Sequence, residues 1–385
     1  MAKAKKTPSQ PVDSPLTGAQ RRAKRKLLSR EVDQVAVAPG LAASDLVAAM
    51  AGMSIQARNL GTCAEVLSGM YRDPARPTVL LGLAGPLIAA GLRRVLRDLV
   101  VGGYVDVVVS TGAILYQDVY QARGFGHFRG TPEADDAALR DLRIDRIYDT
   151  YVDEERFIDT DVWCGRVADE LPPGNYSSRA YLDALGSKLD DDDSIVRQCH
   201  LLGVPIFSPA LNDSSIGIGL TDHRRRCLLA GRAGIAIDSI RDNYELTQIV
   251  VASRKTAAIY VAGGVPKNYI NDSVVMASMF GRDCGHDYAL QVTTAVTQDG
   301  GLSGSTLGEA RSWGKIRKKA HYAMAWVEPS VSLPLLAAYV FDKHPRPARR
   351  RLAFTWNGET LEEMTVRPRS PARKTPPAGR RGPRR

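Results

Sequence analysis

The chain has 385 residues, of which 44% are apolar, and it carries a formal net charge of +10. This length provides enough apolar material for the core of one large domain or of two modest ones. No run of about 18 apolar residues occurs, so we expect no membrane-spanning helix. No apolar segment follows the basic N-terminus, so a secretory signal peptide is not expected either.

The positive charge lies at the two ends of the chain. Residues 1–30 hold nine Lys or Arg and one acid, and residues 343–385 hold thirteen and three, which leaves −8 for residues 31–342. Both ends are rich in Pro and basic residues, so we expect them to be mostly disordered, although an apolar patch at 352–356 can dock on the body. An acidic body suits a cationic substrate, and nucleic acid would bind only weakly, through the ends.

Between the ends, short apolar runs alternate with helical patterns. The runs predict strands at 78–82, 105–110, 204–207, 257–262, 290–294 and 323–327. Helical patterns lie between several of these runs, for example at 86–101 and 330–341. Continuous apolar strands separated by helices indicate an α/β fold with a mostly parallel sheet covered by helices. Ligands of such sheets bind at the carboxyl ends of the strands, where we expect the chemistry.

Five cysteines are scattered along the chain without CxxC spacing. An odd, dispersed set argues against a disulfide framework and against a structural zinc site, so we expect no metal and a reducing compartment, the cytoplasm. The glycine-rich segment 124–130 has the wrong spacing for a dinucleotide-binding loop and follows a helical pattern, so we interpret it as a turn.

An acidic run at 190–193 could suggest a metal site, but no second acidic cluster has suitable spacing. Asp193 or Ser194 is well placed to cap the helix that follows. We therefore interpret Cys199 and His200 as packed residues of that helix.

The segment DGGLSGSTLGEARSWGKIRKK (299–319), called the WGK segment below, carries the most chemical information. Its Gly/Ser-rich start leads into a helix for which Thr306 and Glu309 have the spacing of a capping box. Trp313, Gly314 and Lys315 follow. An indole beside a lysine in a closed pocket would favour the neutral, nucleophilic amine. From these residues alone, an ordinary surface or packing role stays open.

The stretch DGGLSGSTLGEARSWGKI resembles the signature of the deoxyhypusine synthase family. Further resembling segments follow in the family's order, namely MSIQARNLG (53–61), RPTVLLGLAGPLIAAG (76–91), VVVSTGAILYQD (107–118), FSPALNDSSIG (207–217), VAGGVPKNYI (261–270) and VEPSVSLPLL (327–336). The resemblance runs from about residue 40 to about residue 342 and leaves out both basic ends.

This resemblance implies a Rossmann-like α/β domain, usually assembled as a homotetramer with sites between subunits. Family members use NAD to oxidise spermidine to an imine, and the lysine of the WGK motif captures the aminobutyl group. The group then passes to a lysine of a translation factor, or to putrescine in homospermidine synthases. Lys315 is the matching lysine.

The resemblance also implies an NAD site. Matching positions at strand ends are Thr111, Gly112, Ala113, Asp213, Thr294 and Ala295. Glu328 stands where the family has Asp, and 85–89 replaces a more polar family segment.

The amine site is more altered. Glu309, Trp313, Gly314 and Lys315 match, whereas Gln117, Ile218 and Leu302 stand where the family has acids, and Asn268 stands where it has a His that helps to deprotonate the amine. Each lost carboxylate removes a charge-assisted hydrogen bond to an ammonium, so we expect a donor other than spermidine in its usual pose.

An amide cannot accept a proton at neutral pH, so Asn268 cannot act as the base. Tyr269, Tyr116 or water could replace it, or Asn268 could hold the substrate by hydrogen bonds.

Three functions stay open at this point. The first is an NAD-dependent aminoalkyl transferase of polyamine metabolism that forms a Schiff base on Lys315. The second is a true deoxyhypusine synthase with a protein acceptor. The third is a non-catalytic NAD-binding or interaction protein, which Asn268 and the basic ends motivate.

Overall fold

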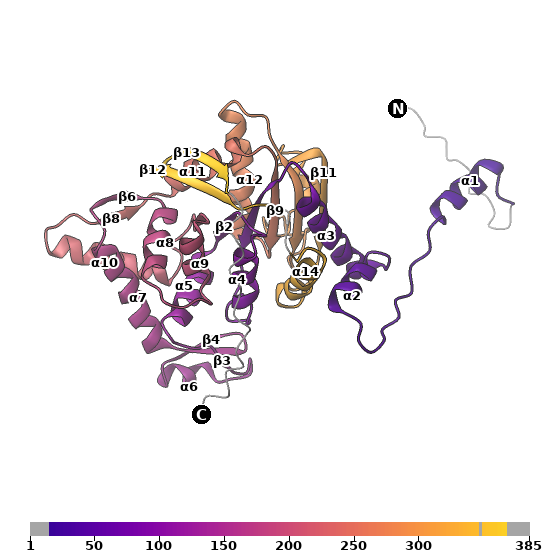
Figure 1. Cartoon of the computed structure of the whole chain (residues 1–385). Helices are drawn as coiled ribbons and strands as arrows, with labels where there is room; N and C mark the ends of the chain where they lie inside the picture. The colour runs from indigo at the N-terminus through magenta and orange to yellow at the C-terminus, as the bar shows by residue number, and fades with distance from the viewer. Residues whose placement is uncertain (1–14, 346–348, 368–385) are drawn as a thin grey trace, which may run out of the picture.

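The computed structural model describes residues 15–345 and 349–367, and a six-stranded sheet forms its centre (Figure 1). In spatial order the strands are β11 (Ile316–Ala325), β10 (His286–Val292), β9 (Thr256–Val261), β1 (Thr78–Leu83), β2 (Val107–Ser110) and β7 (Ile206–Phe207). Every neighbouring pair is parallel. This confirms the expected α/β fold of Rossmann-like type, because the order is that of a doubly wound dinucleotide-binding sheet.

The order of the strands reverses next to β1. The chain first adds β2 and β7 on one side of β1, and it later adds β9, β10 and β11 on the other side. In doubly wound sheets, ligands bind outside the carboxyl ends of the strands at such a switch point. The topology therefore points to the ends of β1 and β9 before any side chain is considered.

All six predicted strands belong to this sheet, but two predicted elements, β11 and α4, begin seven residues away from the predicted position. β11 begins at Ile316 rather than at 323. The sequence pattern missed its first half because that half is mostly exposed and polar, and only the buried second half is an apolar run. The predicted helix 86–101 is observed only as α4 (Arg93–Val101). Its first part is a turn, closed by a 3.0 Å hydrogen bond from Leu92 N to Leu87 O.

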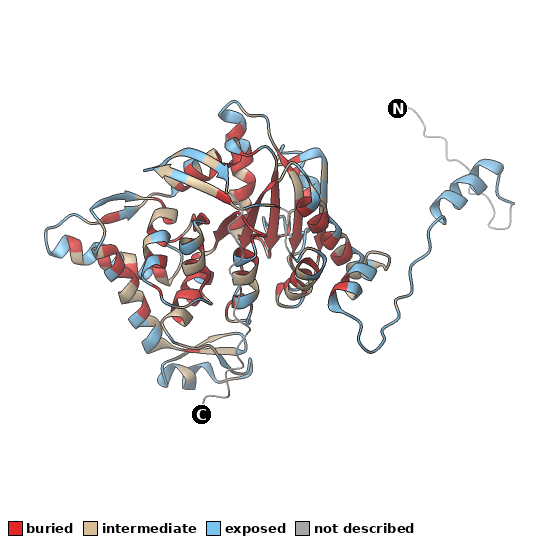
Figure 2. Ribbon diagram, in the orientation of Figure 1, coloured by how far each residue is buried: buried red, intermediate tan, exposed pale blue. Residues whose placement is uncertain are grey.

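Alternate residues of each strand face opposite sides of the sheet, and each side is covered by its own helices (Figure 2). On one side, Leu81 shares a core cluster with α2 (Ala43–Met50), α3 (Ile55–Arg72), α4 and α14 (Pro329–Lys343). On the other side, Leu80 and Tyr260 pack with α11 (Ser239–Ala252), α12 (Gly264–Met279) and α13 (Leu307–Ala310). The sheet is thus buried on both faces, and its strand ends remain for function.

A second group of elements lies beyond β2 and β7 (Figure 1). Its helices are α5 (Gly112–Ala122), α6 (Asp136–Asp141), α7 (Glu154–Asp169), α8 (Ser178–Ser187), α9 (Ile195–Leu202) and α10 (Ser215–Leu229). Two small sheets accompany them, one of β3 (Phe128–Arg129), β5 (Thr150–Asp153) and β4 (Ile144–Ile147), the other of β6 (Gly174–Tyr176) and β8 (Ile235–Ile237).

The acidic run at 190–193 has a structural role in this group. Asp191 pairs with Arg93 at 2.7 Å, and Ser194 caps α9, as predicted, by accepting a hydrogen bond from Arg197 N at 3.1 Å. Cys199 is buried in α9, and His200 Nδ1 lies 2.9 Å from Asp183. Both residues are therefore engaged in packing and pairing within the chain.

The N-terminal segment differs from the expectation in the part that the structure describes. Residues 18–27 form α1 (Gly18–Leu27), whose residues are all exposed. Thr17 and Gln20 form a capping box at its start, a local signal strong enough to begin a helix without a core. Residues 1–14 lie outside the described residues.

The apolar patch at 352–356 does dock on the body. It is most of β12 (Leu352–Asn357), which pairs with β13 (Thr360–Val366) in an antiparallel hairpin. Gln248 of α11 donates to Glu359 O at 2.8 Å and accepts from Leu361 N at 2.9 Å. The guanidinium of Arg179 stacks 4.0 Å from the centre of the Trp356 ring. Residues 346–348 and 368–385 of the basic tail lie outside the described residues.

Among the described residues, no helix is both long and apolar enough to span a membrane. The five cysteines all lie within these residues, and none of them forms a disulfide.

Candidate active site

Two residues with little or no side chain, Gly85 and Ala262, lie at the switch point between β1 and β9. Gly85 follows β1 with φ +84°, and a Cβ there would meet only the Ala262 methyl group, at 4.0 Å. Ala262 follows β9 in the left-handed region, with φ +61°. Two hydrogen bonds hold it there, from its own N to Val292 O at 2.8 Å and from the Gln291 side chain to its carbonyl oxygen at 2.7 Å. A non-glycine residue held in this conformation is typical of functional sites.

Two helices begin close together at the same edge of the sheet. Thr111 is the N-cap of α5, and Gly112 is its buried first residue. A Cβ on Gly112 would lie 2.3 Å from the Ser214 Oγ, at the start of α10. Only glycine allows this approach, which brings the N-termini of α5 and α10 together as a favourable place for an anion such as a pyrophosphate.

The other predicted NAD residues lie at this edge as well. Asp213 is exposed just before α10, and Thr294 and Ala295 follow β10. Glu328 is the N-cap of α14, and its carboxylate accepts a hydrogen bond from Ser330 N at 2.7 Å, so one of its oxygens is already occupied. Open glycine backbone, paired helix N-termini and an exposed acid fit a dinucleotide.

Lys315 lies directly before β11, on the side of the sheet that α12 covers. Its Nζ is 3.1 Å from Asp272 Oδ1 and 3.3 Å from Asn268 Oδ1. Asn268 Nδ2 in turn donates to Asp272 Oδ2 at 2.8 Å. Each of the three side chains therefore contacts the other two, and Asn268 and Asp272 are one turn apart on α12.

The indole does not enclose this lysine within a single chain. Trp313 is 68% exposed, and its ring centre lies 5.6 Å from Lys315 Nζ. The side chain of Lys315 is only 15% exposed, but the contacts that bury it include a carboxylate. The expected lysine enclosed by an indole is therefore not observed: Lys315 pairs with the carboxylate of Asp272, and Trp313 is exposed.

Sequence reasoning missed Asp272 and Lys267. Asp272 has one detectable signal, its i, i+4 spacing from Asn268 on a helix. Lys267 has none, because only packing shows that a lysine is 1% exposed. Burial lowers the pKa of Lys267 to about 8, with the carboxylate of Glu309 raising it and the charge of Lys315 lowering it further.

Lys267 holds the Gly/Ser-rich part of the WGK segment in place. Its Nζ donates to Leu302 O at 3.0 Å, to Ser305 O at 2.6 Å and to Ser305 Oγ at 3.2 Å. Gly264 N donates to Ser303 Oγ at 2.9 Å. As predicted, Thr306 then caps α13 by accepting from Glu309 N at 2.9 Å.

The altered amine-site residues have specific places. Gln117 is buried, and its Oε1 accepts from Ala89 N at 3.2 Å, so it supports the turn after β1. The side chains of Ile218 and Leu302 are exposed. These three positions present no carboxylate to a cationic amine.

Neither phenol named as a replacement base is free. Tyr116 donates to Phe157 O at 2.7 Å, and Tyr269 donates to Ser239 O at 2.8 Å. Burial raises the pKa of both phenols well above the ordinary value, so neither accepts a proton at neutral pH.

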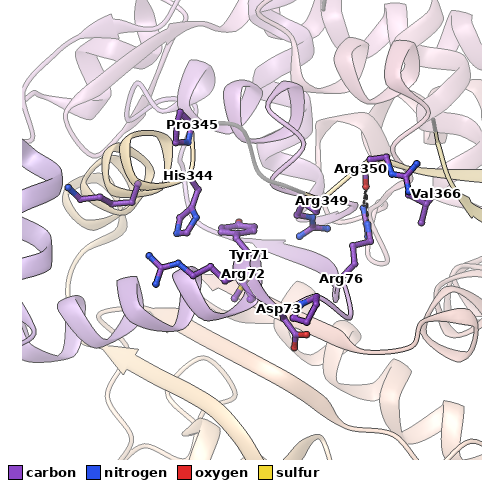
Figure 3. A pocket seen from close by; sticks show the side chains of 12 residues that line it. Tyr71, Arg72, Asp73, Arg76, His344, Pro345, Arg349, Arg350 and Val366 are labelled. Carbon is purple, nitrogen blue, oxygen red and sulfur yellow. Dashed lines mark hydrogen bonds between the residues drawn. The ribbon is translucent and has the colours of Figure 1, made fainter. Parts of the chain in front are cut away.

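A cavity lies away from this site, near the end of α3 and before β1. It has a volume of about 780 Å³, and Figure 3 shows Tyr71, Arg76, His344 and Arg349 around it. Two of its arginines are paired inside the chain, because Arg76 binds Asp106 through two contacts of 3.1 and 2.6 Å, and Arg349 contacts the same carboxylate. The cavity therefore has a different chemistry from that around Lys315.

A cluster of Asp169, His223 and Cys227 also has donor atoms close enough for a metal ion. His223 Nδ1 lies 2.8 Å from Asp169, and His223 Nε2 accepts from Ile235 N at 3.2 Å. Both ring nitrogens are thus occupied, and the cluster is structural.

Comparison with known proteins shows the family of this chain. A family model described as deoxyhypusine synthase matches residues 45–340. The chain belongs to the deoxyhypusine synthase family. Among relatives, the deoxyhypusine synthase-like protein of Chlorobaculum tepidum is 43% identical over 314 residues, which cover 79% of this chain and 88% of the relative. The probable deoxyhypusine synthase 2 of Archaeoglobus fulgidus is 43% identical over 291 residues, covering 75% and 94%.

A solved structure shares the fold of this family member. This is a crystal structure from Entamoeba histolytica named as a deoxyhypusine synthase. It superposes with a TM-score of 0.57, and the match covers 81% of this chain and 97% of the Entamoeba chain. The two sequences are 18% identical, so this likeness concerns the fold alone.

Proposed function

We propose that the protein is an NAD-dependent aminoalkyl transferase of polyamine metabolism that works in the cytoplasm. It oxidises an amine donor to an imine, captures the aminoalkyl group on Lys315 and passes it to an amine acceptor. The observation that carries this proposal is the position of Lys315, which lies within the residues that the family model matches and has its Nζ 3.1 Å from Asp272 and 3.3 Å from Asn268.

NAD would be held at the carboxyl edge of the sheet and would supply the hydride acceptor. The residues proposed for its binding are Thr111, Gly112, Ala113, Asp213, Thr294, Ala295 and Glu328. The N-termini of α5 and α10 would bind the pyrophosphate, and Asp213 would accept hydrogen bonds from ribose hydroxyls.

The residues around Lys315 would bind the amine. Glu309 and Asp272 supply carboxylates, Asn268 supplies a neutral hydrogen-bonding group, and the Trp313 indole and the Gly314 backbone line the approach. Gln117, Ile218 and Leu302 add no charge. A donor with fewer ammonium groups than spermidine, such as a diamine or an agmatine-like compound, fits this set better, because fewer carboxylates are needed to bind it.

We further propose that the active form is a homotetramer, as in the family. Trp313, Ile218 and Leu302 are 68%, 58% and 38% exposed, although they surround or precede the proposed site. A neighbouring subunit that covered these apolar side chains would also close the amine site.

Transfer to a protein lysine is a second candidate. The names of the archaeal relatives favour it, since they are called probable deoxyhypusine synthase 2 at 40–43% identity. The exposed indole would be reachable by a large acceptor. Incubation with labelled spermidine and the hypusine-bearing translation factor decides this question, because no transfer of label to the factor excludes it.

A screen for amine-dependent NADH formation tests the proposed function. Diamines, agmatine and triamines are offered with NAD, and cyanoborohydride is added to trap an imine on Lys315 for mass spectrometry. We expect at least one amine to produce NADH and to add mass to Lys315, and Lys315→Ala to lose the added mass. An NAD-binding protein that forms no NADH with any amine would instead be the non-catalytic homologue.

A further inference from the structure

We propose that the cavity at the end of α3 is a binding site for a phosphate group, with the buried guanidinium of Arg349 at its centre. This cavity is called the arginine cavity below. Its lining residues come from the ends of α3 and α14, the turn before β1 and the segment before β12. It therefore lies at the amino ends of the strands, whereas the residues proposed for NAD follow their carboxyl ends, and the inference does not depend on the proposed function.

The walls of the arginine cavity carry more positive than negative charge. The residues that line it include one acid, Asp73, and five basic residues, namely Arg72, Arg76, Lys343, Arg349 and Arg350. Asp73 is already neutralised, because Lys255 Nζ lies 2.7 Å from its Oδ2 and the Tyr288 hydroxyl donates to the same oxygen at 3.0 Å. Lys343 is paired as well, with Asp45 at 2.6 Å. The charge that remains is that of the four arginines.

One carboxylate serves two of these arginines. The side chain of Asp106, directly before β2, is 3% exposed. It accepts hydrogen bonds from Arg76 at 3.1 and 2.6 Å and from Val79 N at 2.9 Å, and it contacts Nη2 of Arg349. Two guanidinium groups thus share a single negative charge away from water. One positive charge beside Asp106 is left without a counter-ion.

Arg349 is the arginine that lacks partners. Its side chain is 3% exposed, and its Nε and Nη1 have no hydrogen-bond partner in the part of the chain that the structure describes. The Tyr71 ring, whose centre is 5.7 Å from the guanidinium carbon, lies beside it among the side chains around the cavity (Figure 3). Buried N–H groups are rarely left unbonded, because each has lost its hydrogen bonds to water. Arg349 therefore offers a ligand two donors and a charge.

Arg76 holds the two sides of the site together. Its φ of +53° lies in the left-handed region, where a non-glycine residue is strained, and such strain is typical of functional sites. Its Nε and Nη2 donate to Arg350 O at 2.9 and 2.6 Å. The turn before β1 is thereby tied to the segment that carries Arg349. Arg76 is thus a positioning residue, since its guanidinium is bonded to Asp106 and to Arg350.

A phosphate group matches the charge and the donors of this site. Arg72 and Arg350 are exposed, and among the described residues neither side chain has an ion pair or a hydrogen bond. A phosphate monoester brings about two negative charges and three acceptor oxygens. Guanidinium groups bind such oxygens through paired hydrogen bonds. One carboxylate would bring a single charge and fewer oxygens, which would leave more of the positive charge uncompensated.

The C-terminal part of the chain completes the arginine cavity. Arg349 and Arg350 lie beyond residues 45–340, which the family model matches, and directly before the β12–β13 hairpin. The cavity volume of about 780 Å³ is within the range of sites for small molecules and exceeds what a free phosphate ion needs. We therefore expect the phosphate group to belong to a small organic molecule.

Calorimetry with inorganic phosphate and with glucose 6-phosphate measures the binding, with chloride keeping the ionic strength constant. Arg349→Met should raise the Kd for phosphate at least about tenfold, as expected when charge-assisted hydrogen bonds are lost. Arg225→Met is the matched control, because it removes the same charge at an exposed position of α10, and its Kd should equal that of the wild type. Tighter binding of glucose 6-phosphate identifies an organic phosphate as the ligand, and tighter binding of inorganic phosphate identifies the free ion.

Melting temperatures separate ligand binding from a purely structural role of Arg349. In chloride, Arg349→Met should melt no lower than the wild type, because Asp106 keeps Arg76 and Val79 N as donors and an unmatched buried charge is removed. Phosphate should raise the Tm of the wild type and of Arg225→Met more than that of Arg349→Met. A variant Arg349→Met that melts lower in chloride and keeps the full response to phosphate would show a structural role alone and overturn the inference.

Modification by phenylglyoxal needs no variant, and it decides the question if Arg349→Met does not fold. The reagent attacks exposed arginines, and peptide mass spectrometry gives the rate at each of them in the full-length wild type. Phosphate should slow the modification of Arg72 and Arg350 and leave the rate at Arg225 unchanged. Unchanged rates at Arg72 and Arg350 contradict the proposal, and so does equal protection by malonate, a dicarboxylate, at the same concentration.

Discussion

The Nζ of Lys267 lies 2.6 Å from the carbonyl oxygen of Ser305, and this contact ties α12 to the WGK segment. Asn268 and Asp272 lie on the same helix, and Lys315 lies at the end of the same segment. The buried lysine therefore fixes the distance between the amine of Lys315 and the side chains that face it, although it contacts none of them itself.

Removing this tie should destabilise the protein. Lys267→Met keeps most of the side-chain volume but removes the side-chain donor of the Ser305 carbonyl and one of the donors of the Leu302 carbonyl, and it leaves a buried site without its three hydrogen bonds. We expect a loss of about 1–3 kcal/mol in the free energy of unfolding, measured with urea. Lys318→Met, at an exposed position of β11, is the control and should change it little.

The same lysine predicts a pH dependence of stability. Burial lowers the pKa of Lys267 from 10.5 to about 8. Between these values the unfolded chain binds more protons than the folded one, so the contribution of this lysine to stability rises with pH. The difference in unfolding free energy between the wild type and Lys267→Met should move in favour of the wild type from pH 8 to pH 10. A constant difference would contradict the depressed pKa.

Gly112→Ala should damage the NAD edge. The new Cβ would lie 2.3 Å from the Ser214 Oγ, so the starts of α5 and α10 must separate. We expect a loss of about 1–3 kcal/mol in stability, as for other overpacked positions, and weaker NAD binding by calorimetry. In Gly126→Ala the Cβ would meet nothing nearer than 3.5 Å, and NAD affinity should stay at the wild-type value.

Asp213 offers a milder test of the same edge. It is exposed, so Asp213→Asn should leave the melting temperature unchanged. If its carboxylate binds ribose hydroxyls, the Kd for NAD should rise at least about tenfold. An unaltered Kd would remove this residue from the proposed cofactor site.

Trp356→Ala should release the C-terminal hairpin. The indole loses its stacking with Arg179, which lies 4.0 Å from the ring centre, and its contact with the core cluster around α11. We expect faster hydrogen exchange in β12 and β13, and a stability loss of about 1–3 kcal/mol. Thr355→Ala, at an exposed neighbouring position, should leave the exchange unchanged.

The local features of this protein could be predicted from its sequence. Buried parallel strands are continuous apolar runs, and all six were found because each contains a stretch that is buried on both faces. Ser194 and Thr306 act as helix caps because capping depends on residues three positions apart. The WGK segment and the collinear segments around it indicated the family, which the family model over residues 45–340 confirms.

Contacts between distant segments were decided only by the tertiary structure. β11 begins at Ile316, before the apolar run starts. Lys315, the residue directly before this strand, therefore lies against α12 and contacts Asp272. Lys267 is buried because the loop 299–305 folds over it. Sequence patterns report spacing along one helix or strand, whereas the charge and burial of a side chain depend on what packs against it from elsewhere in the chain.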